Sequence, residues 1–299
     1  MAGPAVSVVM PVYNAQTFVA EAVRSVLAQT FADFECIAVD DGSTDDSLAI
    51  LRQLAADDDR LRIITRANTG IVGALNDGLA AARGEFIARM DADDVCMPTR
   101  FERQVEYLRA HADVVALGTW VQEIDRFDSP LAQRRTPVEH DAIDAAHLAG
   151  HGGQIAHPSV MMRHDAVERI GGYREAFPFA EDLDLFLRLA EVGRLANLPD
   201  TLLHYRQHEA NVCFTRQGRQ RQSIAAAVAD ACQRRGIAAP SSEGGHCNTG
   251  SLAERVRSWT LHAIRAGRLD VARRHARRLV CCQPWRPESW RIMYWALRG

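Results

Sequence analysis

Short apolar runs alternate with helical patterns over the first ninety residues of the chain. The runs Val6–Met10, Glu35–Val39 and Phe86–Met90 fit buried strands, and "LRIITRANTG" contains another. Between them, "AQTFVAEAVRSVLAQT", "DDSLAILRQLAADD" and "IVGALNDGLAAARG" have apolar residues at helical spacing. Ser43 or Thr44 is expected to cap the second of these helices, and Gly84 to close the third. The alternation predicts an α/β fold with a mixed, mostly parallel sheet flanked by helices.

The pattern becomes less regular after residue 110. Strands are expected in "ADVVALGTW", "IAHPSVMMRHD" and "DTLLHYRQHEANV", and an amphipathic helix in "FAEDLDLFLRLAEVG". Residues 238–251 are rich in Gly, Ser and Pro, and two helices separated at Gly267 are expected after them. We therefore expect a main domain at 1–215, a helix and linker at 216–250, and a small helical appendage at 251–299.

The charge of the chain is unevenly distributed. The net charge is −3, but residues 251–299 carry 11 Arg against three acidic residues, a net charge of +8. Such a segment can contact an acidic surface such as a membrane or pair with the acidic main body, and both alternatives stay open. The seven cysteines lack C-x-x-C spacing, which argues against a zinc ribbon and fits reduced thiols. Without a signal-peptide pattern or an apolar run of roughly 20 residues, a cytoplasmic location is expected.

Polar loops follow the four strands of the regular region. They read "PVYN", "DDGSTDD", "RANTG" and "DADD". Ligands of open parallel sheets bind beyond the carboxyl ends of the strands, so the four loops predict one binding site. The chain has no G-x-G-x-x-G after the first strand, no P-loop motif and no lysine, which disfavours the standard dinucleotide and P-loop enzymes.

Three carboxylates crowd the end of the fourth strand, at Asp91, Asp93 and Asp94. Like charges at that spacing repel, so a compensating cation is expected. Carboxylate oxygens suit a hard divalent ion, Mg²⁺ or Mn²⁺, which would bridge a diphosphate. One of the three, Asp94, has the alternative role of stabilising a following helix N-terminus. The same alternative applies to the acidic pair Glu181 and Asp182, which begins a later helix.

Read together and in order, "SVVMPVYNAQTFVAEAVRSVLAQTFADFECIAVDDGSTDDS", "RANTGIVGALNDGLAAARGEFIARMDADD", "EDLDLFLR" and "HYRQHEAN" resemble glycosyltransferase family 2. The resemblance covers about residues 5–212. It implies a GT-A fold at 1–215, a nucleotide-sugar donor, a divalent metal and inversion at the anomeric carbon. The chain lacks the Q-x-x-R-W segment of processive members, which argues against processive polymer synthesis.

The resemblance also implies roles for single residues. The nucleoside would be held by Pro11, Tyr13, Asn14 and Asp41. The loop beneath nucleotide and sugar would contribute Arg66, Asn68, Gly70 and Asn76. Asp93 would bind the metal directly, Asp91 would lie nearer the ribose as a second ligand, and His208 would be an extra metal ligand. Asp182 would be the catalytic base, with Glu181 supporting it or touching the acceptor.

Uridine is the commonest base in the family, so a UDP-sugar donor is expected, with a glycan or lipid-linked acceptor. The aromatic end "PWRPESWRIMYWALRG" has the composition of an interfacial helix and could dock on the cytoplasmic face of a membrane. Packing onto the catalytic domain is the alternative. Few aromatic residues interleave the earlier part of the basic segment, so no nucleic-acid partner is expected. Two other functions remain open: a nucleotidyltransferase of related fold, and a degenerate protein that only binds nucleotide sugars.

Overall fold

The computed structural model describes residues 3–208, 217–238 and 251–298. The chain divides into two compact units. The first comprises Met1–Val121, Arg135–Tyr205 and Gly218–Cys247, and the second comprises Gln122–Arg134, Arg206–Gln217 and Asn248–Gly299.

The first unit is built on a sheet whose strand order is β3-β2-β1-β4-β8-β6-β9-β5. The strands of this sheet are β1 Val6–Val12, β2 Phe34–Asp40, β3 Leu61–Thr65, β4 Phe86–Arg89, β5 Val95–Cys96, β6 Val114–Asp125, β8 Met161–Arg163 and β9 Arg194–Gln207. Strands β3, β2, β1 and β4 are parallel, whereas β8 pairs antiparallel with β4 and β6, and β5 with β9. The mixed α/β sheet predicted from the sequence is therefore confirmed, and its parallel part contains the four strands with polar loops.

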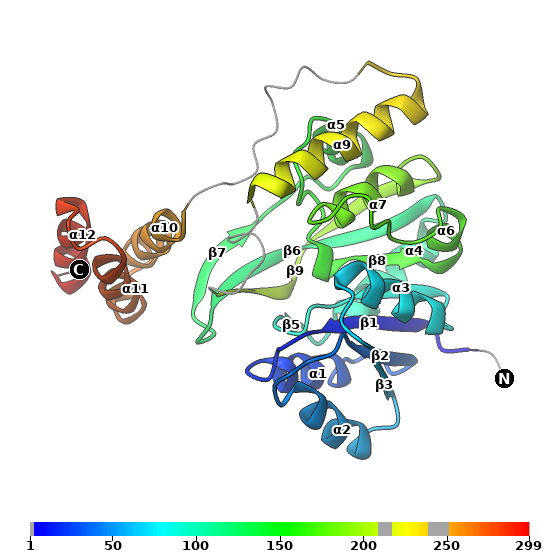
Figure 1. Cartoon of the computed structure of the whole chain (residues 1–299), viewed down its shortest axis with the longest axis horizontal. Helices are drawn as coiled ribbons and strands as arrows, with labels where there is room; N and C mark the ends of the chain where they lie inside the picture. Colours follow the sequence, from blue (N-terminus) through cyan, green and yellow to red (C-terminus); the bar gives the residue numbers. More distant parts are fainter. Residues whose placement is uncertain (1–2, 209–216, 239–250, 299) are drawn as a thin grey trace. The chain divides into compact units, whose positions relative to one another are not determined.

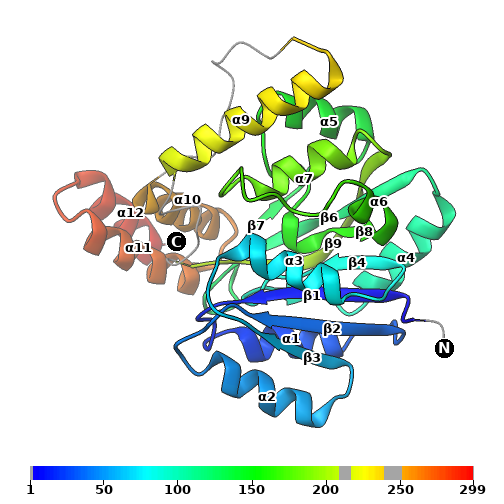
Figure 2. The ribbon, with the colours of Figure 1, turned by 45° about the vertical axis from the view of Figure 1, so that its right-hand side comes forward.

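Helices cover both faces of this sheet, as Figure 1 shows. Val8 and Met10 of β1 share a core with α1 (Val19–Leu27), α2 (Ser47–Asp57) and α4 (Arg100–Ala110). Val9 points to the opposite face, where a second core contains α3, α5, α6 and α7. Figure 2 shows α3 and α2 on opposite sides of the parallel strands. The helices of the second core are α3 Ile71–Ala81, α5 His140–Leu148, α6 His164–Arg169 and α7 Glu181–Leu189. Because strand residues alternate between faces, both faces of β1 must be apolar, which explains its continuous apolar run.

Two predicted helix boundaries are wrong. Helix α2 begins only at Ser47, and neither Ser43 nor Thr44 caps it, because the Ser43 hydroxyl accepts a hydrogen bond from the Asn14 amide instead. Helix α3 ends at Ala81, before Gly84. Gly84 is needed for a different reason: a Cβ there would lie 2.6 Å from the Ser7 backbone nitrogen in the neighbouring strand.

Helix α9 (Gln217–Arg235) packs on the first unit. Its residues Ile224, Val228 and Ala231 share a core with Leu183 and Leu187 of α7. The helix expected within 216–250 therefore lies with the catalytic fold.

The second unit joins a hairpin to three C-terminal helices. The hairpin is formed by the end of β6 and by β7 (Pro130–Arg134). The helices are α10 (Leu252–Arg265), α11 (Leu269–Cys282) and α12 (Pro287–Arg298). Gly267, with a φ of 69°, separates α10 from α11 as predicted, and α12 lies in the aromatic end that has the composition of an interfacial helix. Among the described residues, no helix combines the length and apolar character needed to span a bilayer.

Candidate active site

The loops that follow β1 and β2 are tied together by Asn14. Its φ of 49° lies in the left-handed region, which few residues other than glycine adopt. Its amide donates a hydrogen bond to Oγ of Ser43 at 3.1 Å, and its side-chain oxygen accepts one from the amide of Thr44 at 2.8 Å. Tyr13 beside it is 53% exposed. Asn14 therefore shapes this edge of the sheet, and the Tyr13 ring is available to pack on a ligand.

Asp41 is buried and holds the loop that follows β3. Its carboxylate accepts hydrogen bonds from the amides of Thr69 at 3.1 Å and Gly70 at 2.9 Å. The Arg66 guanidinium lies 3.2 Å from the same carboxylate. Gly70 has a φ of 95° and immediately precedes α3. The side chain of Asp41 thus fixes the shape of the predicted nucleoside pocket, and Asn68 is exposed in the loop that it holds.

Asn76 joins α3 to a distant loop. Its side-chain amide donates to the carbonyl of Tyr173 at 3.0 Å and accepts from the Tyr173 amide at 3.0 Å. A Cβ on neighbouring Gly172 would lie 2.9 Å from the Asn76 side-chain oxygen. Both polar atoms of Asn76 therefore serve this connection, and its contact with a donor stays a prediction.

The carboxylates of Asp91, Asp93 and Asp94 converge directly after β4. One oxygen from each lies within 4.8 Å of the others. Burial raises the pKa of the Asp91 carboxyl above its ordinary value; Arg89 opposes the rise, and the charges of Asp93 and Asp182 add to it. This donor set of oxygens fits a divalent cation, whose charge would relieve the repulsion. Helix α4 begins only at Arg100, so the alternative role of Asp94 at a helix N-terminus is wrong.

The acidic pair Glu181 and Asp182 forms the first turn of α7 and lies close enough to the β4 cluster to act on it electrostatically. Burial raises the pKa of Tyr173 as it does that of Asp91, and the charge of Asp182 adds to both shifts. Burial, followed by the Asp182 charge, raises the pKa of Glu181 to about 7. The fold therefore brings together two acidic groups that are ninety residues apart in the sequence, on β4 and on α7. A perturbed carboxyl next to a second one is typical of a site that handles protons.

Sequence reasoning missed Arg89, the last residue of β4. Its side chain is buried and forms an ion pair with Asp91 at 2.5 Å. Its charge also contributes to lowering the pKa of His157, after burial as the larger cause. His157 in turn contacts the Tyr173 hydroxyl at 2.7 Å. The signal was present in the sequence as a lone arginine within the otherwise apolar run "EFIARM".

Arg100 holds the backbone from which the acidic loop after β4 begins. Its fully buried guanidinium donates hydrogen bonds to the carbonyls of Arg89 at 2.9 Å and Val160 at 3.2 Å. A third hydrogen bond of Arg100 runs to the Gln104 side chain at 3.0 Å. The backbone on which Asp91 follows is thereby fixed from two sides.

His208, the predicted extra metal ligand, directly follows β9 and belongs to the second unit. Its approach to Asp93 therefore stays a prediction. Residues 209–211 of the motif "HYRQHEAN" and residues 212–216 after it lie outside the described residues.

A sheet of this order, with an acidic cluster at the end of β4 and an acidic helix start facing it, defines a GT-A glycosyltransferase. The sequence profile described as Glycosyl transferase family 2 matches residues 7–171. Putative glycosyltransferase EpsE of Bacillus subtilis is 36% identical over 220 residues, which cover 72% of this chain and 77% of that relative. The chain belongs to glycosyltransferase family 2 and is a glycosyltransferase.

Other relatives and solved structures are consistent with this family. The amylovoran biosynthesis glycosyltransferase AmsE of Erwinia amylovora is 33% identical over 204 residues, covering 67% of this chain and 75% of AmsE. The mannosyltransferase PcManGT of Pyrobaculum calidifontis, solved with GDP-Man and Mn²⁺, has a TM-score of 0.61 at 20% identity, over 99% of this chain and 86% of that one. Residues 1–349 of S. aureus TarS, solved with UDP-GlcNAc, have a TM-score of 0.61 at 18% identity, over 92% and 83% of the two chains. These likenesses show the GT-A fold.

Proposed function

We propose that the protein transfers one sugar from a nucleotide-diphosphate sugar to a hydroxyl of a glycan or lipid-linked acceptor, with inversion at the anomeric carbon. The observation that carries the proposal is the carboxylate cluster after β4, whose oxygens lie within 4.8 Å of one another and which the charge of Asp182 reaches. A nucleotidyltransferase has no evident use for a carboxylate base opposite its diphosphate site. The name of the relative AmsE, an amylovoran biosynthesis glycosyltransferase, supports a role in polysaccharide assembly.

On the donor side, Asp93 and Asp91 would hold Mg²⁺ or Mn²⁺, with His208 as a further ligand. The cation would stabilise the negative charge of the departing diphosphate, an effect worth several kcal/mol in metal-dependent enzymes. A uridine base would lie against the Tyr13 ring in the pocket shaped by Asp41. TarS was solved with UDP-GlcNAc and PcManGT with GDP-Man and Mn²⁺, so both donor classes have precedents among proteins of this fold.

On the acceptor side, Asp182 would take the proton of the attacking hydroxyl. A positioned base of this kind contributes typically about 10²–10⁴-fold to the rate. The hydroxyl approaches the anomeric carbon from the face opposite the diphosphate, so one displacement inverts the configuration. Glu181, whose pKa is raised to about 7, would be partly protonated at neutral pH and could donate a hydrogen bond to Asp182 or to the acceptor.

The test is a calorimetric titration of UDP, GDP and dTDP with Mn²⁺, repeated in EDTA. One nucleotide should bind only with the metal, and Asp93→Ala should abolish its binding. Asp182→Asn should bind the nucleotide normally. Its rate of forming free nucleoside diphosphate from the sugar donor should be about 10²–10⁴-fold lower. Binding of no nucleotide by the folded protein would refute the proposed nucleotide-sugar donor. Normal turnover by Asp182→Asn would refute its role as the base.

We also propose that the C-terminal helices bring the protein to a membrane that holds a lipid-linked acceptor. Helix α12 buries Ile292 and Ala296 and leaves Trp290, Tyr294 and Leu297 exposed along one side. Trp285, just before the helix, is 75% exposed. Aromatic side chains combined with basic ones favour an anionic lipid surface.

Sedimentation with vesicles of phosphatidylglycerol and phosphatidylcholine tests this contact. The full chain should bind the anionic vesicles in low salt, and the double variant Trp290→Ala/Tyr294→Ala should lose about ten-fold or more in affinity. The partly buried Met293→Leu serves as a matched control on the same helix. Equal binding by the double variant would contradict the contact. So would absence of vesicle binding by the unaltered protein.

A further inference from the structure

The first turn of α7, which carries Glu181 and Asp182, begins in a strained conformation. Phe179, two residues before the helix, has a φ of 66°. This left-handed region is unfavourable for a bulky side chain. Ala180 at the N-cap provides no side-chain hydrogen bond to the helix. A strained turn of this kind persists only when the surrounding structure holds it.

Helix α9 supplies that support at the N-terminal end of α7. The side-chain amide of Gln220, in the first turn of α9, donates a hydrogen bond to the carbonyl of Phe179 at 3.1 Å. Below this contact, Ile224 and Val228 of α9 pack with Ala180 and Leu183 in one apolar cluster. The carbonyl of the strained residue is thus held by a side chain forty residues later in the chain.

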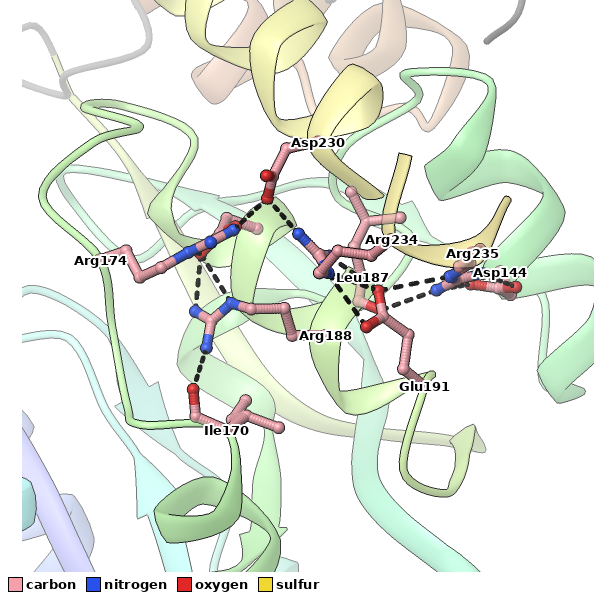
Figure 3. Close-up of polar contacts among 10 residues, drawn as sticks. Asp144, Ile170, Arg174, Leu187, Arg188, Glu191, Asp230, Arg234 and Arg235 are labelled. Carbon is pink, nitrogen blue, oxygen red and sulfur yellow. Dashed lines mark hydrogen bonds and ion pairs between the residues drawn. The ribbon is translucent and has the colours of Figure 1, made fainter. Parts of the chain in front are cut away.

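Helix α9 also holds the middle of α7 through ion pairs. Figure 3 shows Arg174 between two carboxylates, one of which belongs to Asp230 on α9 at 2.6 Å. The other is Asp184 of α7, which also forms an ion pair with Arg188 at 2.6 Å. Asp184 is buried, so water screens its two ion pairs only weakly.

The C-terminal end of α7 is held in the same way. Arg234 lies 2.7 Å from Glu191, and Arg235 donates to the carbonyl of Leu187 at 2.7 Å. Arg235 also forms an ion pair with Asp144 of α5 at 2.7 Å. Helix α9 therefore contacts α7 at its start, its middle and its end, which fixes both its position and its rotation.

We propose that α9 positions the acidic turn for catalysis, and that Gln220 is a positioning residue acting through the Phe179 carbonyl. The proposal rests on the proposed function, since it takes Asp182 as the base. Gln220 contacts the backbone carbonyl of Phe179. Its hydrogen bond holds the backbone turn from which Glu181 and Asp182 project. Because displacement of a reacting group by about 1 Å can lower a rate by roughly 10²-fold, this contact controls turnover without contributing to donor binding.

The chain offers a matched pair of variants. Gln220→Glu replaces the donating amide with a carboxylate of the same size. Gln222→Glu makes the identical change two residues further along α9, at an exposed position. Hydrogen exchange of the full-length protein, followed by mass spectrometry, should show faster exchange in peptides covering 177–183 for Gln220→Glu only. This measurement needs no substrate, so it tests the positioning even if the proposed function fails.

The second measurement separates positioning from general loss of structure. With the donor identified by nucleotide binding, Gln220→Glu should lower kcat for release of nucleoside diphosphate by about 10- to 100-fold. KM for the donor should stay within about two-fold, and Gln222→Glu should match the unaltered protein. Unchanged exchange at 177–183 in Gln220→Glu would overturn the positioning contact. Faster exchange with an unchanged kcat would overturn its control of turnover.

Discussion

At the scale of single residues, the carboxyl of Glu181 is held in an environment that disfavours its charge. Burial and the Asp182 charge raise its pKa from 4.5 in the unfolded chain to about 7. The unfolded state therefore loses its proton first as the pH rises. Glu181 therefore lowers the free energy of unfolding progressively as the pH rises from about 4.5 to 7, and the full decrease is present above pH 7.

We therefore expect Glu181→Gln to stabilise the metal-free protein in alkaline but not in acidic solution. At pH 8 the free energy of unfolding should rise by up to about 3 kcal/mol, whereas at pH 4 the two proteins should be nearly equal. Urea denaturation in EDTA at the two pH values measures the difference. A gain that is the same at both values would show that the charge of Glu181 is not its cause.

His147 is buried between α5 and α7, stacked on Phe186 with 5.7 Å between the ring centres. Neither of its ring nitrogens has a hydrogen-bond partner among the described residues. Burial lowers its pKa from 6.5 to about 4. The unfolded state therefore binds a proton first as the pH falls, and stability is lost from about pH 6.5 down to pH 4.

Replacing His147 by leucine should remove this acid sensitivity. Between pH 7 and pH 4, the unaltered protein should lose about 3 kcal/mol more of its unfolding free energy than His147→Leu does. At pH 7 the variant should be equally stable or more stable, because no unpaired ring nitrogen stays buried. Thermal melts across this pH range test both statements. If the melting temperatures of the two proteins changed equally with pH, His147 would not be the cause of the acid sensitivity.

At the scale of the elements, the parallel strands and their loops could be predicted because local sequence determines them. Each strand is a short apolar run, and each polar loop lies at a strand end whose edge is fixed by parallel pairing. The proximity of β4 to α7 could be expected only through family resemblance, since ninety residues separate them. The roles of Asn76 and Asp41 as connectors could not be predicted, because their partners are backbone groups that have no sequence signal. Ser43 failed as a cap for a similar reason, since a contact from Asn14 competed for its hydroxyl.

Helix α7 depends on one buried carboxylate, Asp184, whose side chain is 1% exposed. Asp184→Asn leaves Arg188 buried without its counter-charge and should cost about 3–5 kcal/mol of unfolding free energy. The double variant Asp184→Leu/Arg188→Met, which removes both charges, should cost clearly less. Urea denaturation of the three proteins tests the comparison. A double variant less stable than Asp184→Asn would refute the argument.

At the scale of the whole molecule, Asp125 organises the second unit. Its Oδ1 accepts hydrogen bonds from the amides of Phe127 and Ser129 at 2.8 and 2.9 Å, which closes the hairpin. Its Oδ2 lies 3.2 Å from Arg274 and 3.1 Å from His275, both on α11. Burial alone would raise the pKa of Asp125, but the hydrogen bond with His275 and the two amides lower it below its ordinary value. A single carboxylate thus joins segments that are about 150 residues apart in the chain.

Asp125→Asn should loosen the C-terminal helices from the hairpin while leaving the first unit intact. Loss of the charged acceptor weakens the hydrogen bonds to the hairpin and α11 by about 1.5–3 kcal/mol, so a protease should cut within 251–298 about ten-fold faster or more. Asp270→Asn, the same change at an exposed site on α11, is the control. Equal cleavage rates for Asp125→Asn and Asp270→Asn would contradict this account.

The ion pairs drawn in Figure 3 use arginine as their only cation, and this sequence contains no lysine at all. A guanidinium keeps its proton above about pH 12, whereas a lysine would lose its proton near pH 10.4. The ion pairs between α7 and α9 should therefore persist in alkaline solutions in which lysine-based ion pairs lose their positive charge. The same composition makes the chain nearly inert to amine-directed labels. No side chain of this sequence carries a primary amine, so a succinimidyl ester would leave these ion pairs unmodified.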